Sequence, residues 1–586
     1  MSSWKCKICG YIYNESEISS KIPFTDLPVK WKCPVCGAGK DAFEKIDETD
    51  IHASATKTVS DVIISELSAW GIKLVFGLPG TSSLGLVEAI RKNNAVRYIV
   101  VRHEENAAMA ASAYNKLTGN IAACLTIAGP GATNCATGLY DAKEDHASVI
   151  SINGQVEAQY SGPGGIQEID QDAFFRPVSV YNNTIYDRDK TVLLLTRALK
   201  YATIRHGVAQ LSVPNNIQKM PLEIKKCKRE KCTDSLVLPD SDTITRAATM
   251  INGAKNPVII AGWGAFRYPD HIAALAEKTS APVITTFRAK GVLPDSHPWN
   301  LGILGNVGSP AARDWVNESD LLITLGVGFS KYTNVPLTKP MLQIDIDPLK
   351  LGISPESTPL WGDAGLIINA LLPLIKNRNI EKNREKITAM QSEWNRLRDA
   401  EADASKKPIR PPYIMKILSE VIPEDAVISL DVGENQWWFG RNFRMKKQRF
   451  VMSGYLGAMG FGLPGAIAAK LACPEKDVFC ITGDGGFSMA MADFVTAVKY
   501  NLPMVIIILN NHELGMIQVE QMMEQYPNYG TDLYNPDFAA FASVCGGKGI
   551  RVEDPASLKN ALTEAIGNTI PTIIDIETDP VRFYRS

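Results

Sequence analysis

The chain has 586 residues, enough for about three or four domains of ordinary size. Its 61 basic and 63 acidic residues give a net charge of −2, so no strong overall field attracts nucleic acid or anionic lipid. The N-terminal stretch lacks the apolar segment of a signal peptide, and no apolar run approaches the ~20 residues that span a bilayer. We therefore expect a cytoplasmic protein without stable membrane contact.

Four cysteines form two matching pairs near the N-terminus. Cys6 and Cys9 make the first pair, Cys33 and Cys36 the second, and each pair is followed by glycine. Four thiolates at this spacing suit one tetrahedral metal ion. Residues 1–46 are too few for a self-sufficient core, so a metal is expected to hold this unit together. The cysteines by themselves leave zinc and a single iron open.

The residues around the cysteines favour iron. The stretches CKICGYIYNE and FTDLPVKWKCPVCGAGKDAFE closely resemble rubredoxin over nearly all of residues 4–46. The resemblance implies that four aromatic residues pack beneath the metal, namely Tyr11, Tyr13, Trp31 and Phe43. It also implies one iron that carries one electron, with structural zinc as the alternative. The segment between the cysteine pairs is a few residues shorter than in free-standing rubredoxins.

The chain then changes to an alternation of helices and apolar strands. Residues 47–57 are polar and predict a linker. Thr58–Trp70 predicts a helix, KLVFGLPG and VRYIVV predict strands, and ENAAMAASAYNKLTG predicts an Ala-rich helix closed by Gly119. This rhythm indicates a doubly wound parallel sheet in residues 58–231.

Two more α/β units follow. Apolar strands that end in turn residues place a second unit at residues 240–376. A polar, helical and then proline-rich connector covers residues 377–412, and a third unit occupies residues 413–586. The sequence therefore predicts an α/β protein with three doubly wound parallel-sheet domains and a small N-terminal four-cysteine domain.

In the second unit, glycines and acidic residues follow the predicted strands. Gly262 and Gly264 come after PVIIA, and Asp345 and Asp347 lie in QIDIDP. Strand-end glycines can approach a dinucleotide phosphate, and carboxylates can bind ribose. The pattern is typical of a dinucleotide site.

The most specific motif lies in the third unit. An apolar strand is joined to a helix by Gly483, Asp484, Gly485 and Gly486. A helix N-terminus after glycines is a natural diphosphate site, because free amide groups point outward there. Asp484, Asn511 at the end of the next strand and the backbone carbonyl of Glu513 would coordinate Mg2+.

This arrangement resembles the binding motif for thiamine diphosphate (ThDP). The resemblance implies that Glu104, which opens the Ala-rich helix, activates the aminopyrimidine ring of the cofactor. Gly129 and Pro130, in GPGATN, match the wall beside that ring. A glutamate at this place can also simply complement the helix dipole.

Two further stretches match the cofactor site of this superfamily. Met459, in LGAMGFG, matches the bulky residue that bends ThDP, although a methionine is more often a core residue. Gly433, in DVGENQWW, matches a second diphosphate loop, where Glu434 is an unusual neighbour for an anion. In this superfamily Glu104 and the diphosphate loop of one site come from two subunits, which implies a homodimer at least and favours a tetramer.

From Thr58 onward the chain resembles the pyruvate oxidase and acetolactate synthase group, whose central domain often holds FAD. Gln167, in GGIQEIDQD, matches an active-site glutamine of both branches. Glu520 matches pyruvate oxidases, which carry glutamate at this position, whereas acetolactate synthases carry tryptophan there. The resemblance implies that Glu520 manages protons over the reacting carbon; a solvated helical glutamate is the alternative.

The rubredoxin resemblance also favours the oxidase branch. Oxidation after decarboxylation releases two electrons, which a flavin can accept and pass on singly to a tethered iron centre. The chain ends at Ser586 without the amphipathic tail of quinone-linked pyruvate oxidases, which favours a soluble final acceptor. We expect an enzyme with ThDP, Mg2+, FAD and iron that oxidatively decarboxylates pyruvate or a similar small 2-keto acid.

Two alternatives stay open. One is an acetolactate synthase-type carboligase without net redox chemistry, in which the four-cysteine unit regulates or docks. The other is a non-enzymatic electron-transfer adaptor, which the intact Glu104 and Asp484 disfavour. The sequence also leaves acetate and acetyl phosphate open as products.

Overall fold

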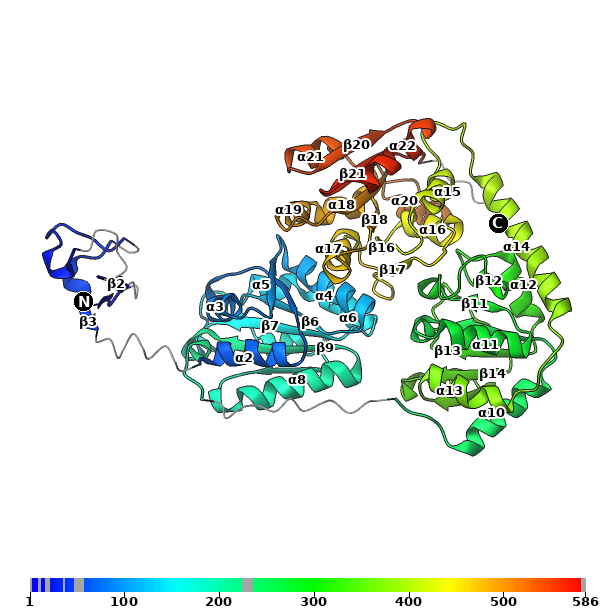
Figure 1. Cartoon of the computed structure of the whole chain (residues 1–586), viewed down its shortest axis with the longest axis horizontal. Helices are drawn as coiled ribbons and strands as arrows, with labels where there is room; N and C mark the ends of the chain where they lie inside the picture. The colour runs from blue at the N-terminus through cyan, green and yellow to red at the C-terminus, as the bar shows by residue number, and fades with distance from the viewer. Residues whose placement is uncertain are drawn as a thin grey trace.

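The computed structural model describes residues 3–8, 12–15, 22–34, 37–46, 57–223 and 236–580. Three six-stranded parallel sheets with flanking helices make up most of it, and a small antiparallel sheet lies near the N-terminus (Figure 1). The prediction of three doubly wound α/β units is thereby confirmed. No helix of the described residues is long and apolar enough to cross a membrane.

The four-cysteine unit is built on a three-stranded antiparallel sheet. Its strands, in the order β2-β1-β3, are β1 (Ser3–Cys6), β2 (Ile12–Asn14) and β3 (Phe43–Ile46). Trp4 stacks on Phe24 with ring centroids 4.7 Å apart, and Trp31 meets Phe24 edge-on at 5.6 Å. An aromatic cluster thus fills the core of a unit that has few aliphatic side chains to bury.

Two of the four cysteines belong to this cluster. Cys6 and Cys33 are buried in it together with Tyr13. Cys9 and Cys36, like Tyr11, lie outside the described residues.

The N-terminal unit (residues 57–223) has the strand order β5-β4-β6-β7-β9-β8. The strands are β4 (Leu74–Gly77), β5 (Arg97–Val100), β6 (Ala122–Thr126), β7 (Val149–Gln155), β8 (Tyr181–Thr184) and β9 (Val208–Pro214). The helices are α2 (Val59–Ala69), α3 (Leu84–Lys92), α4 (Glu104–Thr118), α5 (Pro130–Asn134), α6 (Ala136–Glu144), α7 (Gln171–Phe175), α8 (Thr191–Arg205) and α9 (Asn215–Gln218). The helix predicted over Thr58–Trp70 is α2, with Thr58 and Trp70 as its two caps. As predicted, Gly119 closes α4, in the left-handed conformation with φ 73°.

The central unit (residues 236–376) has the order β12-β11-β10-β13-β14-β15. The strands are β10 (Pro257–Ala261), β11 (Val283–Thr285), β12 (Asn300–Ile303), β13 (Leu321–Leu325), β14 (Met341–Asp345) and β15 (Ser357–Trp361). The helices are α10 (Ser241–Gly253), α11 (Pro269–Thr279), α12 (Pro310–Glu318) and α13 (Ala364–Leu371). The winding direction reverses between β10 and β13, and ligands of doubly wound sheets bind at the carboxyl ends of strands at such a reversal.

The C-terminal unit (residues 411–580) follows a long helix, α14 (Glu381–Glu401). Its strands, in the order β17-β16-β18-β19-β21-β20, are β16 (Val427–Leu430), β17 (Arg449–Met452), β18 (Val478–Gly483), β19 (Val505–Asn510), β20 (Lys548–Val552) and β21 (Thr572–Glu577). The helices are α15 (Pro411–Val421), α16 (Glu434–Asn442), α17 (Gly462–Ala472), α18 (Asp484–Ala490), α19 (Phe494–Lys499), α20 (Gly515–Met523), α21 (Phe538–Val544) and α22 (Pro555–Ile566). Counted along the chain, its strands have the same spatial order as those of the N-terminal unit.

Helices α4 and α17 pack against each other and join the N-terminal and C-terminal units in one hydrophobic core (Figure 1). Both helices are rich in alanine. Short side chains let the two backbones approach closely, so each helix is buried over most of its surface.

All three units meet at Asp145, which follows α6. Its carboxylate is fully buried and accepts hydrogen bonds from the backbone amides of Gly454 and Tyr455, both at 2.9 Å. Lys116 lies 2.6 Å away and Arg288, from the central unit, 2.9 Å away. Although burial raises the pKa of Asp145, Arg288 and Lys116 lower it to about 2. A single charged side chain therefore ties the three units together.

Candidate active site

The glycine-rich motif lies where the winding of the C-terminal sheet reverses. Gly433 follows β16 and Gly483 ends β18, its neighbour. Gly433 has φ 134°, a conformation that favours glycine. A Cβ at Gly433 or Gly483 would meet only the Asn435 Oδ1, at 3.2 and 3.6 Å, and nothing else within 4 Å. The two glycines therefore leave an open cradle between two loops.

Asp484 opens α18 beside this cradle and is only 2% exposed. Its Oδ2 accepts a hydrogen bond of 2.6 Å from Asn535, which also donates to Asn510 at 2.9 Å. Burial raises the pKa of Asp484, because these donors do not fully replace water around the carboxylate. A divalent cation bridging the carboxylate and a diphosphate would stabilise its charge, so the residues present fit the expected Mg2+.

Asn511 lies directly after β19. Its side-chain Oδ1 accepts from the backbone amide of Glu513 at 3.1 Å, and its Nδ2 donates to Glu434 at 3.3 Å. Glu434, an unusual neighbour for a phosphate, thus holds the amide of Asn511 in place. Asn511 and Glu513 follow β19, which is the neighbour of β18 in the sheet, and Asp484 follows β18.

Met459 lies against the start of α18. A Cβ at Gly485 would come within 3.3 Å of its methyl carbon and 2.9 Å of Leu514. A Cβ at Gly486 would meet the carboxylate of Asp431 at 2.9 Å. A side chain at Gly486 would press on the buried carboxylate of Asp431, whereas one at Gly485 would meet only the ends of flexible side chains. Met459 is half-buried beside the cradle instead of deep in the core.

Asp431, at the end of β16, is a site residue that the sequence did not single out. Its carboxylate accepts from the amides of Val432 (2.7 Å), Gly460 (2.9 Å) and Gly462 (3.1 Å) and from the hydroxyl of Thr482 (3.0 Å). Burial raises the pKa of Asp431 to about 6 in spite of these donors. It fixes the Met459 loop to the strand that ends at Gly483. Its strand-end position is the one signal that could have marked it.

Asp431→Asn should lower both stability and ThDP affinity. The NH2 group of the new asparagine would face backbone amides that also donate, so some of their hydrogen bonds would be lost. We expect a loss of about 2–3 kcal/mol in the free energy of unfolding. Chemical denaturation with and without ThDP would measure both effects. The control is Asp425→Asn at an exposed position, and equal behaviour of the two variants would contradict this role for Asp431.

Glu104 opens α4 and is only 5% exposed. Its Oε2 accepts a hydrogen bond of 3.0 Å from Asn134, at the end of the turn that begins with Gly129 and Pro130. A Cβ at Gly129 would lie 2.7 Å from the carbonyl oxygen of Gln167. Glu104, the GPGATN turn and Gln167 are therefore brought together in the N-terminal unit.

The Gln167 loop is held by the next residue. Glu168 accepts hydrogen bonds from the backbone amides of Gly162, Gly164 (2.8 Å) and Gly165 (3.1 Å). These amides lower the pKa of Glu168. The side chain of Gln167 is exposed, at a residue with φ 66°.

Within one chain, the Glu104 group and the cradle do not meet. Arg102 and Asn106 flank Glu104, and both donate to Asp493, at 2.8 and 2.5 Å. Asp493 lies after the C-terminal end of α18, whereas Asp484 opens that helix. At a rise of about 1.5 Å per residue, the seven residues of α18 alone span roughly 10 Å. Glu520, on α20, is exposed in the single chain.

Comparison with protein-family models identifies the body of the chain. The N-terminal TPP binding domain of thiamine pyrophosphate enzymes matches residues 57–174, the central domain residues 244–371 and the C-terminal TPP binding domain residues 431–576. The chain belongs to the thiamine pyrophosphate enzyme family. A rubredoxin model matches residues 3–43, so this ThDP enzyme also carries a rubredoxin domain.

Curated relatives of this ThDP enzyme span nearly all of its body. YdaP of Bacillus subtilis (strain 168), whose name describes it as thiamine pyrophosphate-containing, is 40% identical over 89% of this chain and 92% of its own. Pyruvate oxidase of Lactiplantibacillus plantarum is 30% identical over 91% of this chain and 89% of its own. Acetolactate synthase isozyme 1 large subunit of Escherichia coli (strain K12) is 30% identical over 89% of this chain and 94% of its own. The last two relatives represent the two predicted branches.

The glycines of the central domain of this ThDP enzyme follow β10, where the winding of the sheet reverses toward β13. A Cβ at Gly262 would come within 2.0 Å of the Gly326 carbonyl, and one at Gly264 within 3.0 Å of the Gly326 Cα. The packing of one loop on the other therefore already requires glycine at both positions. The place agrees with a dinucleotide site, but the contacts themselves are internal.

The acidic residues of the central domain have local partners. Asp345 ends β14 and accepts from the amide of Asp347 at 2.9 Å, and burial raises the pKa of Asp345. Asp347 caps the following turn by accepting from Leu349 at 3.0 Å. Asp345 is half-buried and lies at the carboxyl end of its strand, whereas Asp347 lies in the turn that follows.

Proposed function

We propose that this ThDP enzyme is a pyruvate oxidoreductase that passes electrons through FAD to its rubredoxin iron. The reaction would convert pyruvate and water to acetate, CO2, two protons and two electrons, or yield acetyl phosphate where phosphate replaces water. The observation that carries the proposal is the rubredoxin domain fused to a body that resembles pyruvate oxidase. A carboligase reaction has no net redox step that a one-electron centre could serve.

The residues of the chain have distinct tasks in this proposal. ThDP supplies a carbon nucleophile when bound, and FAD a two-electron acceptor. Glu104, buried and oriented by Asn134, would hold a proton at the aminopyrimidine ring. Asp484 and Asn511 would hold Mg2+ with the carbonyl of Glu513, and Met459 would bend the cofactor.

The other proposed roles concern substrate and flavin. Gln167 and Glu520 would contact the keto acid. FAD would lie at the carboxyl ends of the central strands, near Gly262, Gly264 and Asp345, which the reversed strand order supports. Cys6 and Cys33, with Cys9 and Cys36, would bind the iron, and a soluble carrier would take the final electrons.

We also propose a homodimer as the smallest active form, with a tetramer as its natural extension. In a single chain the neighbours of Glu104 contact Asp493, beyond the C-terminal end of α18, whereas Asp484 opens that helix, so a second subunit would complete each site. Large apolar side chains are exposed beside both groups, among them Ile166 (93%) in the Gln167 loop and Met489 (62%) on α18. A partner subunit would cover them.

The redox proposal predicts two spectral changes under anaerobic conditions. Adding pyruvate should bleach the flavin bands first and then remove the ferric-thiolate bands of the rubredoxin domain. Cys6→Ser should abolish the second change and keep the first, because it removes a ligand of the iron only. Cys473→Ser, a half-buried cysteine outside the rubredoxin domain, is the control. A protein without flavin bands, or with a colourless metal site, would overturn the proposal.

The second candidate function is an acetolactate synthase-type carboligase. It is favoured by the acetolactate synthase relative, which is as similar to this chain as the pyruvate oxidase is. Formation of acetolactate from pyruvate without any electron acceptor would support it.

Glu520→Gln tests which branch applies. If Glu520 manages protons at the reacting carbon, pyruvate oxidation should fall by about 10²–10⁴-fold with ThDP still bound. Glu524→Gln, at the exposed end of the same helix, should leave the rate unchanged. Unchanged oxidation by Glu520→Gln would mean that Glu520 is a solvated surface residue.

A further inference from the structure

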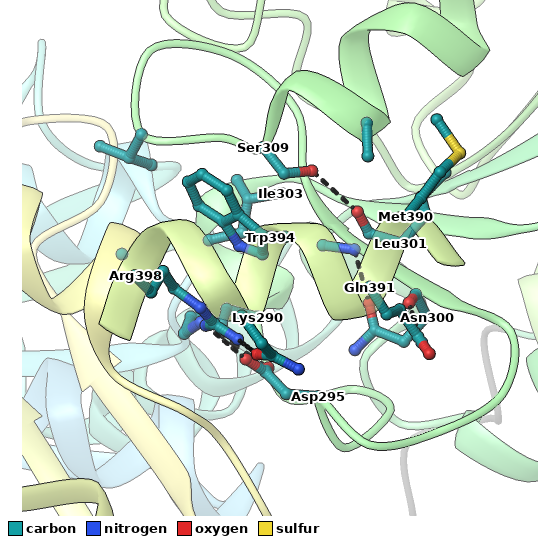
Figure 2. Close-up of a pocket in the computed structure, with 15 residues that line it drawn as sticks. Lys290, Asp295, Asn300, Leu301, Ile303, Ser309, Met390, Gln391, Trp394 and Arg398 are labelled. Atoms are coloured by element: carbon teal, nitrogen blue, oxygen red, sulfur yellow. Dashed lines mark hydrogen bonds and ion pairs between the residues drawn. The ribbon is translucent and has the colours of Figure 1, made fainter. Parts of the chain in front are cut away.

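A small cavity lies where α14 crosses the central unit and meets α16 (Figure 2). Its volume is about 30 Å³, and its lining includes Lys290, Asp295, Trp394, Arg398 and Gly440. One water molecule needs roughly 10–15 Å³ by the same kind of measure, so the cavity holds about two water-sized bodies. A nucleotide, a diphosphate or a keto acid would not fit.

The cavity carries more positive than negative charge. Lys290 and Arg398 are only 4% and 6% exposed, and Asp295 is the carboxylate that they share. Arg398 Nη1 donates to Asp295 Oδ2 at 3.0 Å, whereas Lys290 Nζ is 3.7 Å from Asp295 Oδ1, beyond hydrogen-bond distance. Figure 2 shows the three side chains converging below α14. Burial lowers the pKa of Lys290 to about 8.

One donor at this cavity has no acceptor. Arg398 Nε is buried and finds no hydrogen-bond partner among the residues that the structure describes. Arg398 Nη2, by contrast, donates to the side chain of Asn395 at 2.5 Å. A buried guanidinium N–H without an acceptor is unfavourable, because water no longer solvates it.

Nearby carboxylates on α14 are already engaged. Glu401 pairs with Arg441 at 2.5 Å. Asp399 pairs with Arg444 at 2.8 Å and with Lys416 at 3.1 Å. Neither Glu401 nor Asp399 is therefore free to neutralise the positive charge that Asp295 leaves unbalanced at the cavity.

We propose that this cavity binds a small monovalent anion, a halide or a carboxylate no larger than formate. The anion would accept hydrogen bonds from Lys290 Nζ and Arg398 Nε and would balance the excess charge. The site is distinct from the cofactor cradle, since it lies near Gly440 in the last turn of α16, whereas Gly433 precedes the first. An anion there would fasten α14 to the central unit.

The test compares melting temperatures of the full-length holoenzyme at constant ionic strength. The chloride concentration rises from 0 to about 200 mM, and gluconate makes up the rest of the salt. Gluconate is too large for the cavity. Wild type should gain roughly 2–4 °C, because a ligand that binds only the folded state stabilises it. Formate should have the same effect as chloride if the site accepts carboxylates, and none if it accepts halides alone; both results fit the proposal.

Two variants and one crystallographic measurement complete the test. Lys290→Met leaves the Arg398–Asp295 pair neutral and should remove the chloride response. The control is Arg396→Gln on the exposed side of α14, which should respond like wild type. Equal responses in all three proteins, or no response in wild type, would overturn the proposal. Wild-type crystals soaked in bromide should show an anomalous peak between Lys290 and Arg398, and ordered water without bromide there would refute the site.

Discussion

Glu104→Gln should lose about 10²–10⁴-fold of pyruvate-oxidising activity while it keeps its cofactors. The carboxyl group of Glu104 is buried, and Asn134 donates to it at 3.0 Å, so its position is well defined. Glutamine has nearly the same shape but cannot exchange a proton with the aminopyrimidine ring. Reduction of an artificial electron acceptor would give the rate, and chromatography of released cofactors would give the ThDP content.

Glu105→Gln is the matched control for this variant. Glu105 is the next residue of α4 and also lies in its first turn. If Glu104 only complements the helix dipole, both variants should lose about 0.3–1 kcal/mol of stability and keep their activity. A selective loss of activity in Glu104→Gln would support the proposed role.

Asp145→Asn should lower the free energy of unfolding by about 3–5 kcal/mol. It would leave Lys116 and Arg288 buried with one carboxylate fewer, and it would break the contacts that join all three units. Chemical denaturation of the variant and of Glu144→Gln, an adjacent and partly exposed glutamate, would measure the difference. Equal midpoints would show that the junction contributes little.

The same carboxylate predicts how stability depends on pH. Its folded pKa of about 2 is below the ordinary 3.8, so its contribution is complete above pH 3.8. That contribution is lost as the pH falls through 2. Asp145→Asn should lack this component, and denaturation series between pH 2 and 5 would detect its absence.

Helix ends that depend on nearby residues agree closely with what the sequence predicts. Thr58 caps α2, Gly119 closes α4 and Asp484 opens α18, because capping and helix termination depend on side chains a few residues away. The strand-end glycines of the central unit have a reason that the sequence did not show. Glycine is required at Gly262 and Gly264, but the immediate reason is the backbone of Gly326.

Contacts between residues far apart in the sequence were not predicted. Asn535 donates to Asp484, which lies 51 positions earlier, and no local pattern marks this pair. Glu434 holds Asn511 across 77 positions, although the sequence suggested a doubtful phosphate contact. These partners meet only because neighbouring strands bring their carboxyl ends to one edge of the sheet.

The sequence by itself determined the family, the order of the α/β units and the motif from Gly483 to Asn511, because each rests on patterns within a short stretch. The tertiary structure decided which groups share a site. It places Asp431 under the Met459 loop, gathers three units at Asp145 and leaves Lys290 and Arg398 in one cavity with Asp295. It also separates Glu104 from Asp484 within one chain. The physical reason is that packing between units depends on whole surfaces, which no single segment of the sequence encodes.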